Sequence, residues 1–218
     1  SREEAAQLSA KGSEIIYSDP KSPASRVTER LVKFGNTTLT DTILGVTFNY
    51  ACEGFFQVNI PVYEKTLSDM RDWIDHENNL PTLDLYSGVG TIGLTIGGDD
   101  ITLVEINEHA VAEMQRNTTK LNRANAKAIL APSEKSLEYI MGEQIVIVDP
   151  PRAGLHADVV RRLLETTPPR IIYLSCNPVT QARDVSLLQE KYKIVHHQGY
   201  NFFPRTPHIE HLVVLDKK

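Results

Sequence analysis

The sequence has few cysteines, no long apolar run and no excess of positive charge. Cys52 and Cys176 are too few for a disulfide framework or a four-thiolate metal site, so we expect both to remain thiols. No stretch approaches the ~18 uninterrupted apolar residues that a membrane span requires, and the opening SREEAAQLSA lacks the layout of a signal peptide. These absences predict a cytoplasmic protein without a membrane partner.

The charge balance gives no sign of a surface that grips nucleic acid. The 23 Lys and Arg residues are outnumbered by 28 Asp and Glu residues, and the formal net charge is -5. Proteins that bind nucleic acid through its phosphates usually carry a basic patch or stripe. With 218 residues, of which 41% are hydrophobic, the chain can nevertheless bury one sizeable core.

Apolar strand-like runs alternate with helical patterns from about Leu80 onward. Such alternation is typical of a parallel sheet with helices on both faces, so we predict a doubly wound α/β domain. Residues 193–216 contain two strand-like runs without a helix between them, which indicates an antiparallel pair at one sheet edge. The earlier strand-like runs are TLDLY (82–86), ITLVEI (101–106), QIVIVD (144–149) and RIIYLS (170–175).

The first 55 residues differ from the rest. They contain short strand-like runs separated by Gly, Asn and Asp, with little helical periodicity, which predicts a short β-rich segment belonging to another unit. Residues 60–74 then show apolar residues at helical spacing with Pro61 near the start, which predicts an amphipathic helix. We therefore expect one unit over residues 1–55 and a second over residues 56–218.

A glycine-rich loop follows the first strand of the α/β pattern. Gly88, Gly90 and Gly93 form G-x-G-x-x-G at the start of a helix, and Glu105 ends the next strand, where an acid can accept both hydroxyls of a ribose. This pattern predicts a nucleoside-containing cofactor and does not separate a dinucleotide from S-adenosylmethionine. Asp84, inside the first strand, is more typical of methyltransferases, in which an acid supports this loop.

Two prolines follow an aspartate at the end of another strand. Pro150 and Pro151 lack backbone N–H groups, so the strand stops and Asp149 is held at the carboxyl edge of the sheet, where ligands bind in such folds. Enzymes that methylate exocyclic amino groups usually have an aromatic residue after the prolines. Arg152 stands there, which speaks against amine methylation.

Cys176 lies at the same edge, after the strand RIIYLS. Asn177 is a favoured N-cap and Pro178 a favoured first helical residue, so the sulfur should lie beside the positive end of a helix. We expect this position to lower the pKa of the thiol and to make it a nucleophile. The alternative, a buried cysteine acting as a small apolar residue, suits Cys52 better.

A thiolate is useful to a methyltransferase that acts on carbon 5 of a pyrimidine. Addition of sulfur to carbon 6 pushes electron density across the ring and makes carbon 5 nucleophilic. A base must then remove the carbon 5 proton, and Glu210 is a carboxylate in an otherwise apolar strand, where desolvation should raise its pKa. His208 and His211 flank it without a convincing set of further ligands, so we expect no metal site.

Six motifs together closely resemble the RNA uracil-5-methyltransferase family, which makes 5-methyluridine in transfer and ribosomal RNA. They are GFFQVN, LDLYSGVGTIGL, VEIN, DPPRAGL, YLSCNP and HIEHL, in the family's order between about residues 54 and 215. The resemblance implies a class I methyltransferase fold of the Rossmann-like type, S-adenosylmethionine as donor, and a flipped-out uridine of tRNA or rRNA as acceptor.

The resemblance also implies roles for particular residues. Cys176 corresponds to the nucleophile at carbon 6 and Glu210 to the base at carbon 5. The implied cofactor-binding residues are Gln57, Tyr86, Gly88, Gly90, Thr91, Glu105 and Asp149, and those near the uracil are Phe55, Gln57 and Asp149.

The chain departs from the family in its length. Members usually carry an N-terminal β-barrel that binds RNA and a central domain, often with four cysteines that hold an iron–sulfur cluster. Residues 1–55 resemble only the end of that central part, so we expect no metal or iron–sulfur ligands in this chain, and a monomer. The basic RNA-binding surface would then lie in the missing portion.

Three other functions are weighed against this one. A 5-methylcytidine RNA methyltransferase also places a cysteine after this strand, but usually has another in the Asp-Pro-Pro region, where this sequence has none. A non-catalytic fragment that binds cofactor or RNA is favoured by the missing domains and disfavoured by the presence of Cys176 and Glu210. NAD-dependent redox chemistry would leave the prolines and the thiol without a role.

Overall fold

A computed structural model of the chain describes residues 12–18, 28–51, 55–74 and 79–218. Its largest element is a seven-stranded sheet, which confirms the predicted doubly wound α/β fold. The strands of this sheet are β5 (Thr82–Leu85), β6 (Ile101–Glu105), β7 (Ala126–Leu130), β8 (Ile145–Val148), β9 (Arg170–Ser175), β10 (Tyr192–Tyr200) and β11 (Glu210–Lys217), in the order β10-β11-β9-β8-β5-β6-β7.

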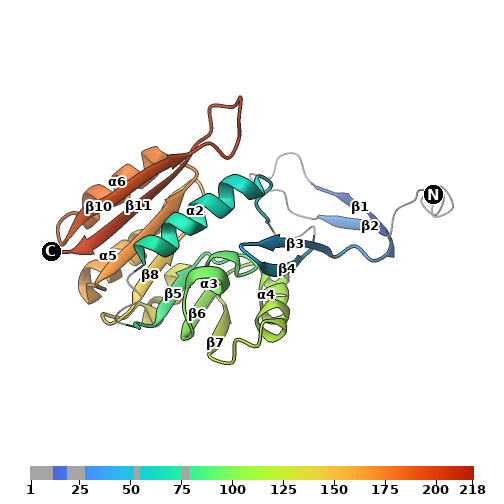
Figure 1. Cartoon of the computed structure of the whole chain (residues 1–218), viewed down its shortest axis with the longest axis horizontal. Helices are drawn as coiled ribbons and strands as arrows, with labels where there is room; N and C mark the ends of the chain where they lie inside the picture. Colours follow the sequence, from blue (N-terminus) through green and yellow to red (C-terminus); the bar gives the residue numbers. More distant parts are fainter. Residues whose placement is uncertain (1–11, 19–27, 52–54, 75–78) are drawn as a thin grey trace.

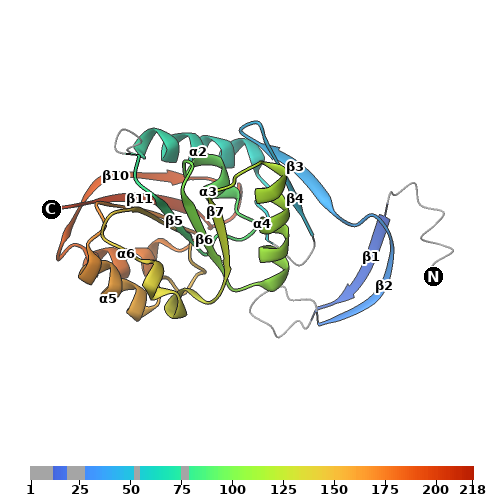
Figure 2. The same cartoon turned by 90° about the horizontal axis from the view of Figure 1, so that it is seen from below.

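Helices cover both faces of the sheet (Figure 2). Alternate residues of a strand point to opposite faces, and in β8 Ile145 and Ile147 belong to one core while Val146 and Val148 belong to the other. The first core contains α2 (Ile60–Trp73), α3 (Thr91–Ile96) and α4 (Glu108–Lys120), and the second contains α5 (Ala157–Thr166) and α6 (Pro178–Leu188), with the short turns η1 (Ser133–Lys135) and η2 (Leu137–Tyr139) on the same side.

The direction of the chain reverses beside β5. From β5 the chain continues through β6 and β7 on one side, then returns to form β8 and β9 on the other, and these five strands pair in parallel. Ligands of open α/β sheets bind at the carboxyl ends of the strands that flank such a reversal. The ends of β5 and β8 are therefore the expected place for a site.

The end of the chain forms the predicted antiparallel pair. Strand β10 pairs with β11, and β11 pairs antiparallel with β9, with His211 opposite Ser175. The edge strand β10 thus lies outside β11 (Figure 1). This arrangement brings the start of β11 next to the end of β9.

The N-terminal part consists of two hairpins, which confirms the predicted β-rich segment. Strands β1 (Gly12–Tyr17) and β2 (Glu29–Gly35) project from the body of the molecule, whereas β3 (Leu39–Ile43) and β4 (Val46–Tyr50) lie against it (Figures 1 and 2). Ile43 and Phe48 of the second hairpin are fully buried in the core that contains α2 and α4. In the described ranges no helix is long and apolar enough to cross a bilayer. Cys52 lies outside the described residues.

Candidate active site

The glycine loop turns the chain from β5 into α3. Gly88 and Gly90 have positive φ angles of 56° and 87°, which glycine adopts at little cost, and Gly90 is the residue before the helix. A Cβ added at Gly88 would meet nothing within 4 Å, so the space beside this residue is open. Tyr86 also has a positive φ, 63°, and this uncommon conformation of a non-glycine residue marks the turn as functionally constrained.

Two acids hold the loop from neighbouring strands. The N–H of Gly88 donates to Oε2 of Glu105 at 2.9 Å, and the N–H of Gly93 donates to Oδ2 of Asp84 at 2.9 Å. Asp84 is fully buried, and its other oxygen, Oδ1, has no hydrogen-bond partner among the described residues. Burial raises the pKa of Asp84 to about 7, against the effect of the Gly93 hydrogen bond. The predicted support of the loop by Asp84 is therefore present.

A pocket opens between this loop and the segment before α2. Tyr63 of α2 lies in it, and its hydroxyl forms a 2.8 Å hydrogen bond with Oγ1 of Thr91. Gln57 is buried, with an Oε1 that no described residue partners. The pocket is lined by Phe55, Phe56, Gln57, Tyr63, Tyr86, Ser87, Gly88, Val89, Thr91, Ile92 and Asp149, which includes six of the residues predicted to bind cofactor or uracil.

Tyr63 and Phe56 were not among the predicted site residues. Tyr63 precedes Leu67 and Met70 by four and seven residues, and all three are buried on one face of α2. This spacing places Tyr63 on the inward face. That it reaches Thr91 depends on how α2 packs on the sheet, which the sequence does not state.

The loop after Asp149 is fastened to the start of α6. The carbonyl oxygen of Arg152 accepts hydrogen bonds from Nδ2 of Asn177 at 2.9 Å and from Oγ1 of Thr180 at 3.1 Å. The fully buried Oδ2 of Asp184 accepts the N–H of Leu155 at 2.8 Å. Asn177 is also the predicted N-cap, since its side chain accepts the N–H of Val179, the second residue of α6. These bonds fix the two loops relative to each other.

The pairing of β9 with β11 brings Cys176 near Glu210. The last pair that β9 and β11 form at this end is Ser175 with His211, so the adjoining residues, Cys176 and Glu210, lie at the same end of the sheet. The charge of Glu210 raises the pKa of the Cys176 thiol, so the two groups are close in space. The thiol and the carboxylate, which are 34 positions apart in the sequence, are thereby neighbours.

Several acids share this end of the sheet. Glu210 is 3% exposed, and burial raises its pKa to about 7 although Arg152 opposes the shift. Burial also raises the pKa of Asp149 well above its usual range, and the negative charges of Glu210 and Asp84 add to that effect. Asp149 is thus close enough to Glu210 and Asp84 for their charges to act on it. The predicted rise of the Glu210 pKa is present.

The prediction for the Cys176 pKa was wrong in its sign. Burial raises the pKa of this thiol, and the charges of Glu210 and Asp149 raise it further. The Arg152 guanidinium, which hydrogen-bonds the sulfur, lowers it but does not outweigh them. The start of α6 is where the sequence predicted it, so the error came from the burial of the thiol and, after it, from acids that only the fold brings near.

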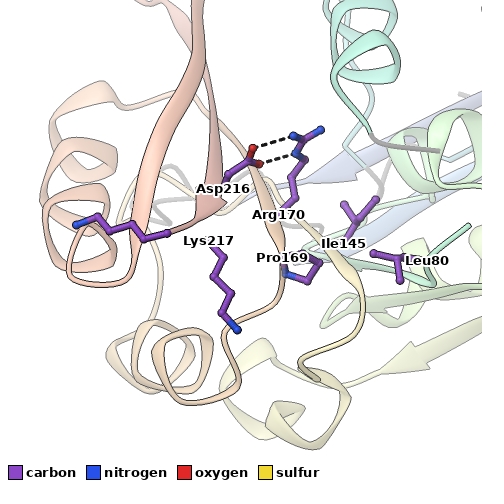
Figure 3. A pocket seen from close by; sticks show the side chains of 7 residues that line it. Leu80, Ile145, Pro169, Arg170, Asp216 and Lys217 are labelled. Atoms are coloured by element: carbon purple, nitrogen blue, oxygen red, sulfur yellow. Dashed lines mark hydrogen bonds and ion pairs between the residues drawn. The ribbon is translucent and has the colours of Figure 1, made fainter. Parts of the chain in front are cut away.

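A second pocket lies at the opposite, amino end of the sheet (Figure 3). Arg170 donates to both carboxylate oxygens of Asp216 there, at 2.7 and 2.9 Å. None of the predicted site residues lies in it; the lining residues are Leu80, Ile145, Pro169, Arg170, Asp216, Lys217 and Lys218. Within the described ranges, no three His, Cys, Asp or Glu residues are arranged to hold a metal ion.

Comparison with known proteins points to one family. Residues 136–218 match the family model for tRNA (uracil-5-)-methyltransferase. An uncharacterized RNA methyltransferase of Enterococcus faecalis is 36% identical over 196 residues, which is 87% of this chain and 43% of that protein. One from Nanoarchaeum equitans is 35% identical over 194 residues, which is 88% of this chain and 42% of that protein.

The fold has a close counterpart among solved structures. The tRNA (uracil-54, C5)-methyltransferase of Pyrococcus abyssi, in complex with S-adenosyl-L-homocysteine, superposes with a TM-score of 0.83 and is 30% identical. The alignment covers 97% of this chain and 52% of that one. The chain thus has the class I methyltransferase fold, and it spans less than half the length of the curated relatives it matches.

Proposed function

Because the chain belongs to the RNA uracil-5-methyltransferase family, we propose that it is the catalytic portion of an enzyme that methylates carbon 5 of a uridine in RNA. The observation that supports this proposal is the β9–β11 pairing, which brings Glu210 and Cys176 to the same end of the sheet, where the charge of Glu210 acts on the thiol. A thiol and a carboxylate close together are the two groups that carbon 5 chemistry requires.

The pocket beside the glycine loop fits S-adenosylmethionine. Oε1 of Gln57, which lines the pocket, is a buried acceptor without a partner among the described residues, and so is Oδ1 of Asp84 in β5, which does not line it. A ligand whose cationic amino-acid end reached them would satisfy both. Gly88 leaves open space for close approach, and Glu105 ends β6 where the ribose hydroxyls of such a ligand would lie. When bound, S-adenosylmethionine supplies an electrophilic methyl group.

Two residues of the chain carry out the other steps: Cys176 adds its sulfur to the base, and Glu210 removes a proton from it. The Cys176 thiolate adds to carbon 6 of the uracil, and the electron pair of the 5,6 double bond moves toward carbon 5 and O4. After methylation, carbon 5 carries both the new methyl group and its original proton. Glu210 takes this proton, the double bond re-forms, and the sulfur leaves carbon 6 as a thiolate.

Three residues are assigned to the target base. Asp149 and Gln57 line the pocket with polar atoms, and Phe55 is 70% exposed at its edge, where an aromatic ring can stack on a flipped-out base. A protonated Asp149 can donate to O4 while its other oxygen accepts the N3 proton. Burial raises the pKa of Asp149 well above its usual range, which favours this protonated form.

The RNA partner is assigned from the names of the relatives. The family model and the P. abyssi protein both refer to tRNA, so we take tRNA as the first substrate to test and rRNA as the second. We further propose that residues 1–55 end a β-rich RNA-binding unit and that residues 56–218 form the methyltransferase unit. We also propose that the protein is cytoplasmic, because a reducing compartment keeps Cys176 as a thiol, and that it is a monomer.

A covalent trap tests the proposal. The full-length protein is incubated with S-adenosylmethionine and tRNA containing 5-fluorouridine, in which fluorine replaces the proton that Glu210 must remove. We expect a denaturation-resistant protein–RNA adduct with wild type and with the control Asp216→Asn, whose change lies at the far end of the sheet. Cys176→Ala should give none. An adduct that persists in Cys176→Ala, or forms equally with 5-fluorocytidine RNA, would contradict the proposal.

A further inference from the structure

Asn117 of α4 joins two separate parts of the chain. The residue is fully buried, and its Oδ1 accepts the N–H of Asn49 at 2.9 Å. Its Nδ2 donates to the carbonyl of Asn49 at 3.1 Å and to the carbonyl of Val89 at 3.3 Å. Because Asn49 belongs to β4 and Val89 lies between Gly88 and Gly90, one amide connects the N-terminal hairpin with the glycine loop.

The contact to Val89 completes the set of bonds that fix the glycine loop. Gly88 donates its N–H to Glu105 at 2.9 Å, and Gly90 donates its N–H to the carbonyl of Ser87 at 2.8 Å. A loop with glycines at positive φ has more conformational freedom than other backbone, so such bonds decide its position. Asn117 is the side chain that binds the peptide group between the two glycines.

The contact to Asn49 leads to the other side of the pocket. The next residue of β4, Tyr50, stacks its ring on Phe56, with ring centres 4.1 Å apart and planes at 4°. Phe56 and its neighbour Gln57 line the same pocket as Gly88 and Val89. Asn117 is therefore connected to the pocket twice: directly through Val89, and through β4 and the Tyr50–Phe56 contact.

We propose that Asn117 is a positioning residue that sets the glycine loop relative to the segment Phe55–Gln57. This inference rests on the proposed function, because it assumes that the glycine loop binds the methyl donor. Loss of the amide leaves the buried Val89 carbonyl unpaired and lets the loop shift, so donor affinity falls. The second hairpin is in this sense a part of the donor site although it does not touch the donor.

Glu64 offers a matched control. Its Oε1 accepts the N–H of Leu44 at 2.8 Å and so fastens the same hairpin to α2, without contact to the glycine loop. Asn117→Leu and Glu64→Leu each remove a buried or half-buried anchor of the hairpin and should both lower the melting temperature. The affinity for S-adenosylhomocysteine is measured by calorimetry on the folded proteins. We expect Asn117→Leu to weaken it about tenfold and Glu64→Leu by less than about twofold.

The outcomes separate the inference from the proposed function. If wild type does not bind S-adenosylhomocysteine, the proposed function fails. If wild type binds and Asn117→Leu binds within about twofold of it, or if Glu64→Leu is weakened as much, the positioning role is overturned. Should Asn117→Leu not fold, Asn117→Asp replaces it, because it keeps the acceptor for Asn49 and lacks the donor for Val89. The same loss of affinity is expected there.

Discussion

The two ends of the seven-stranded sheet differ in how their charged groups are paired. At the amino end, Arg170 and Asp216 form a two-point ion pair, and Arg170 also donates to the carbonyl of Trp73 at 2.6 Å. Within this pair, charge and hydrogen-bonding geometry are matched. Pairs of this geometry are the strong form of a charge-assisted hydrogen bond.

At the carboxyl end the charges are not matched. Three acids are buried there: Asp84, Asp149 and Glu210. Glu210 and Asp84 raise the pKa of Asp149, and Glu210 and Asp149 raise that of Cys176. Arg152 is a cation that lowers the pKa of both Glu210 and Cys176. Buried acids without compensation destabilise a fold, so their presence calls for a ligand that pairs with them. The comparison teaches that the amino end contributes stability and the carboxyl end contributes chemistry.

The largest effect is expected from Glu210→Gln, which removes the base at the unmatched end. Sulfur can still add to carbon 6, but the carbon 5 proton stays, so turnover should fall by about 10³-fold and a protein–RNA adduct should accumulate. Electrophoresis under denaturing conditions with labelled tRNA measures the adduct. Wild-type turnover should rise with pH through about 7, where Glu210 loses its proton, and this rise should be absent in the variant. Normal turnover of Glu210→Gln would remove it from the mechanism.

Most of the fold could be predicted because its signals are local. The alternation of apolar runs with helical patterns indicated β5, β6, β8 and β9, and the absence of a helix within residues 193–216 indicated the antiparallel pair. The place of the pocket followed as well, since the carboxyl ends of parallel strands meet at one edge. The strands, the antiparallel pair and the place of the pocket can be predicted from hydrophobic periodicity and chain direction alone.

The electrostatics of the site could not be predicted because they depend on burial and on which distant residues meet. Asn177 and Pro178 correctly indicated the start of α6, and a thiol beside a helix start is normally acidified. The sequence does not show that the Cys176 thiol is partly buried or that Glu210 and Asp149 lie near it, and these effects together reverse the shift of its pKa. Local motifs therefore found the groups, but the balance between them needed the three-dimensional arrangement.

A smaller effect, on stability alone, is expected at the matched end. Arg170→Met leaves Asp216, itself largely covered, without its cation, so the free energy of unfolding should fall by about 2 to 3 kcal/mol. Urea unfolding measures this. The affinity for S-adenosylhomocysteine should stay the same, because the pair lies at the far end of the sheet. Adding Asp216→Asn should recover part of the loss, and a drop in affinity would contradict the division between the two ends.

The smallest effect concerns Asp84, and its sign depends on pH. The pKa of Asp84 is raised from 3.8 to about 7 in the folded protein, so between these values the folded state binds more protons than the unfolded state. Its contribution to stability therefore decreases as pH rises, by about 1 kcal/mol between pH 6 and pH 8. Asp84→Asn cannot ionise and lacks this decrease.

Urea unfolding of wild type and Asp84→Asn at pH 6 and pH 8 measures that contribution together with the effect of the Asp84 charge on Asp149. Relative to wild type, the variant should gain stability at pH 8 and lose affinity for S-adenosylhomocysteine, since Oδ1 of Asp84 is the buried acceptor that the ligand would pair. Asp99→Asn, at an exposed aspartate, should change neither. A difference in stability between variant and wild type that is the same at both pH values would mean that the Asp84 carboxyl of the folded protein does not change its protonation state between pH 6 and pH 8.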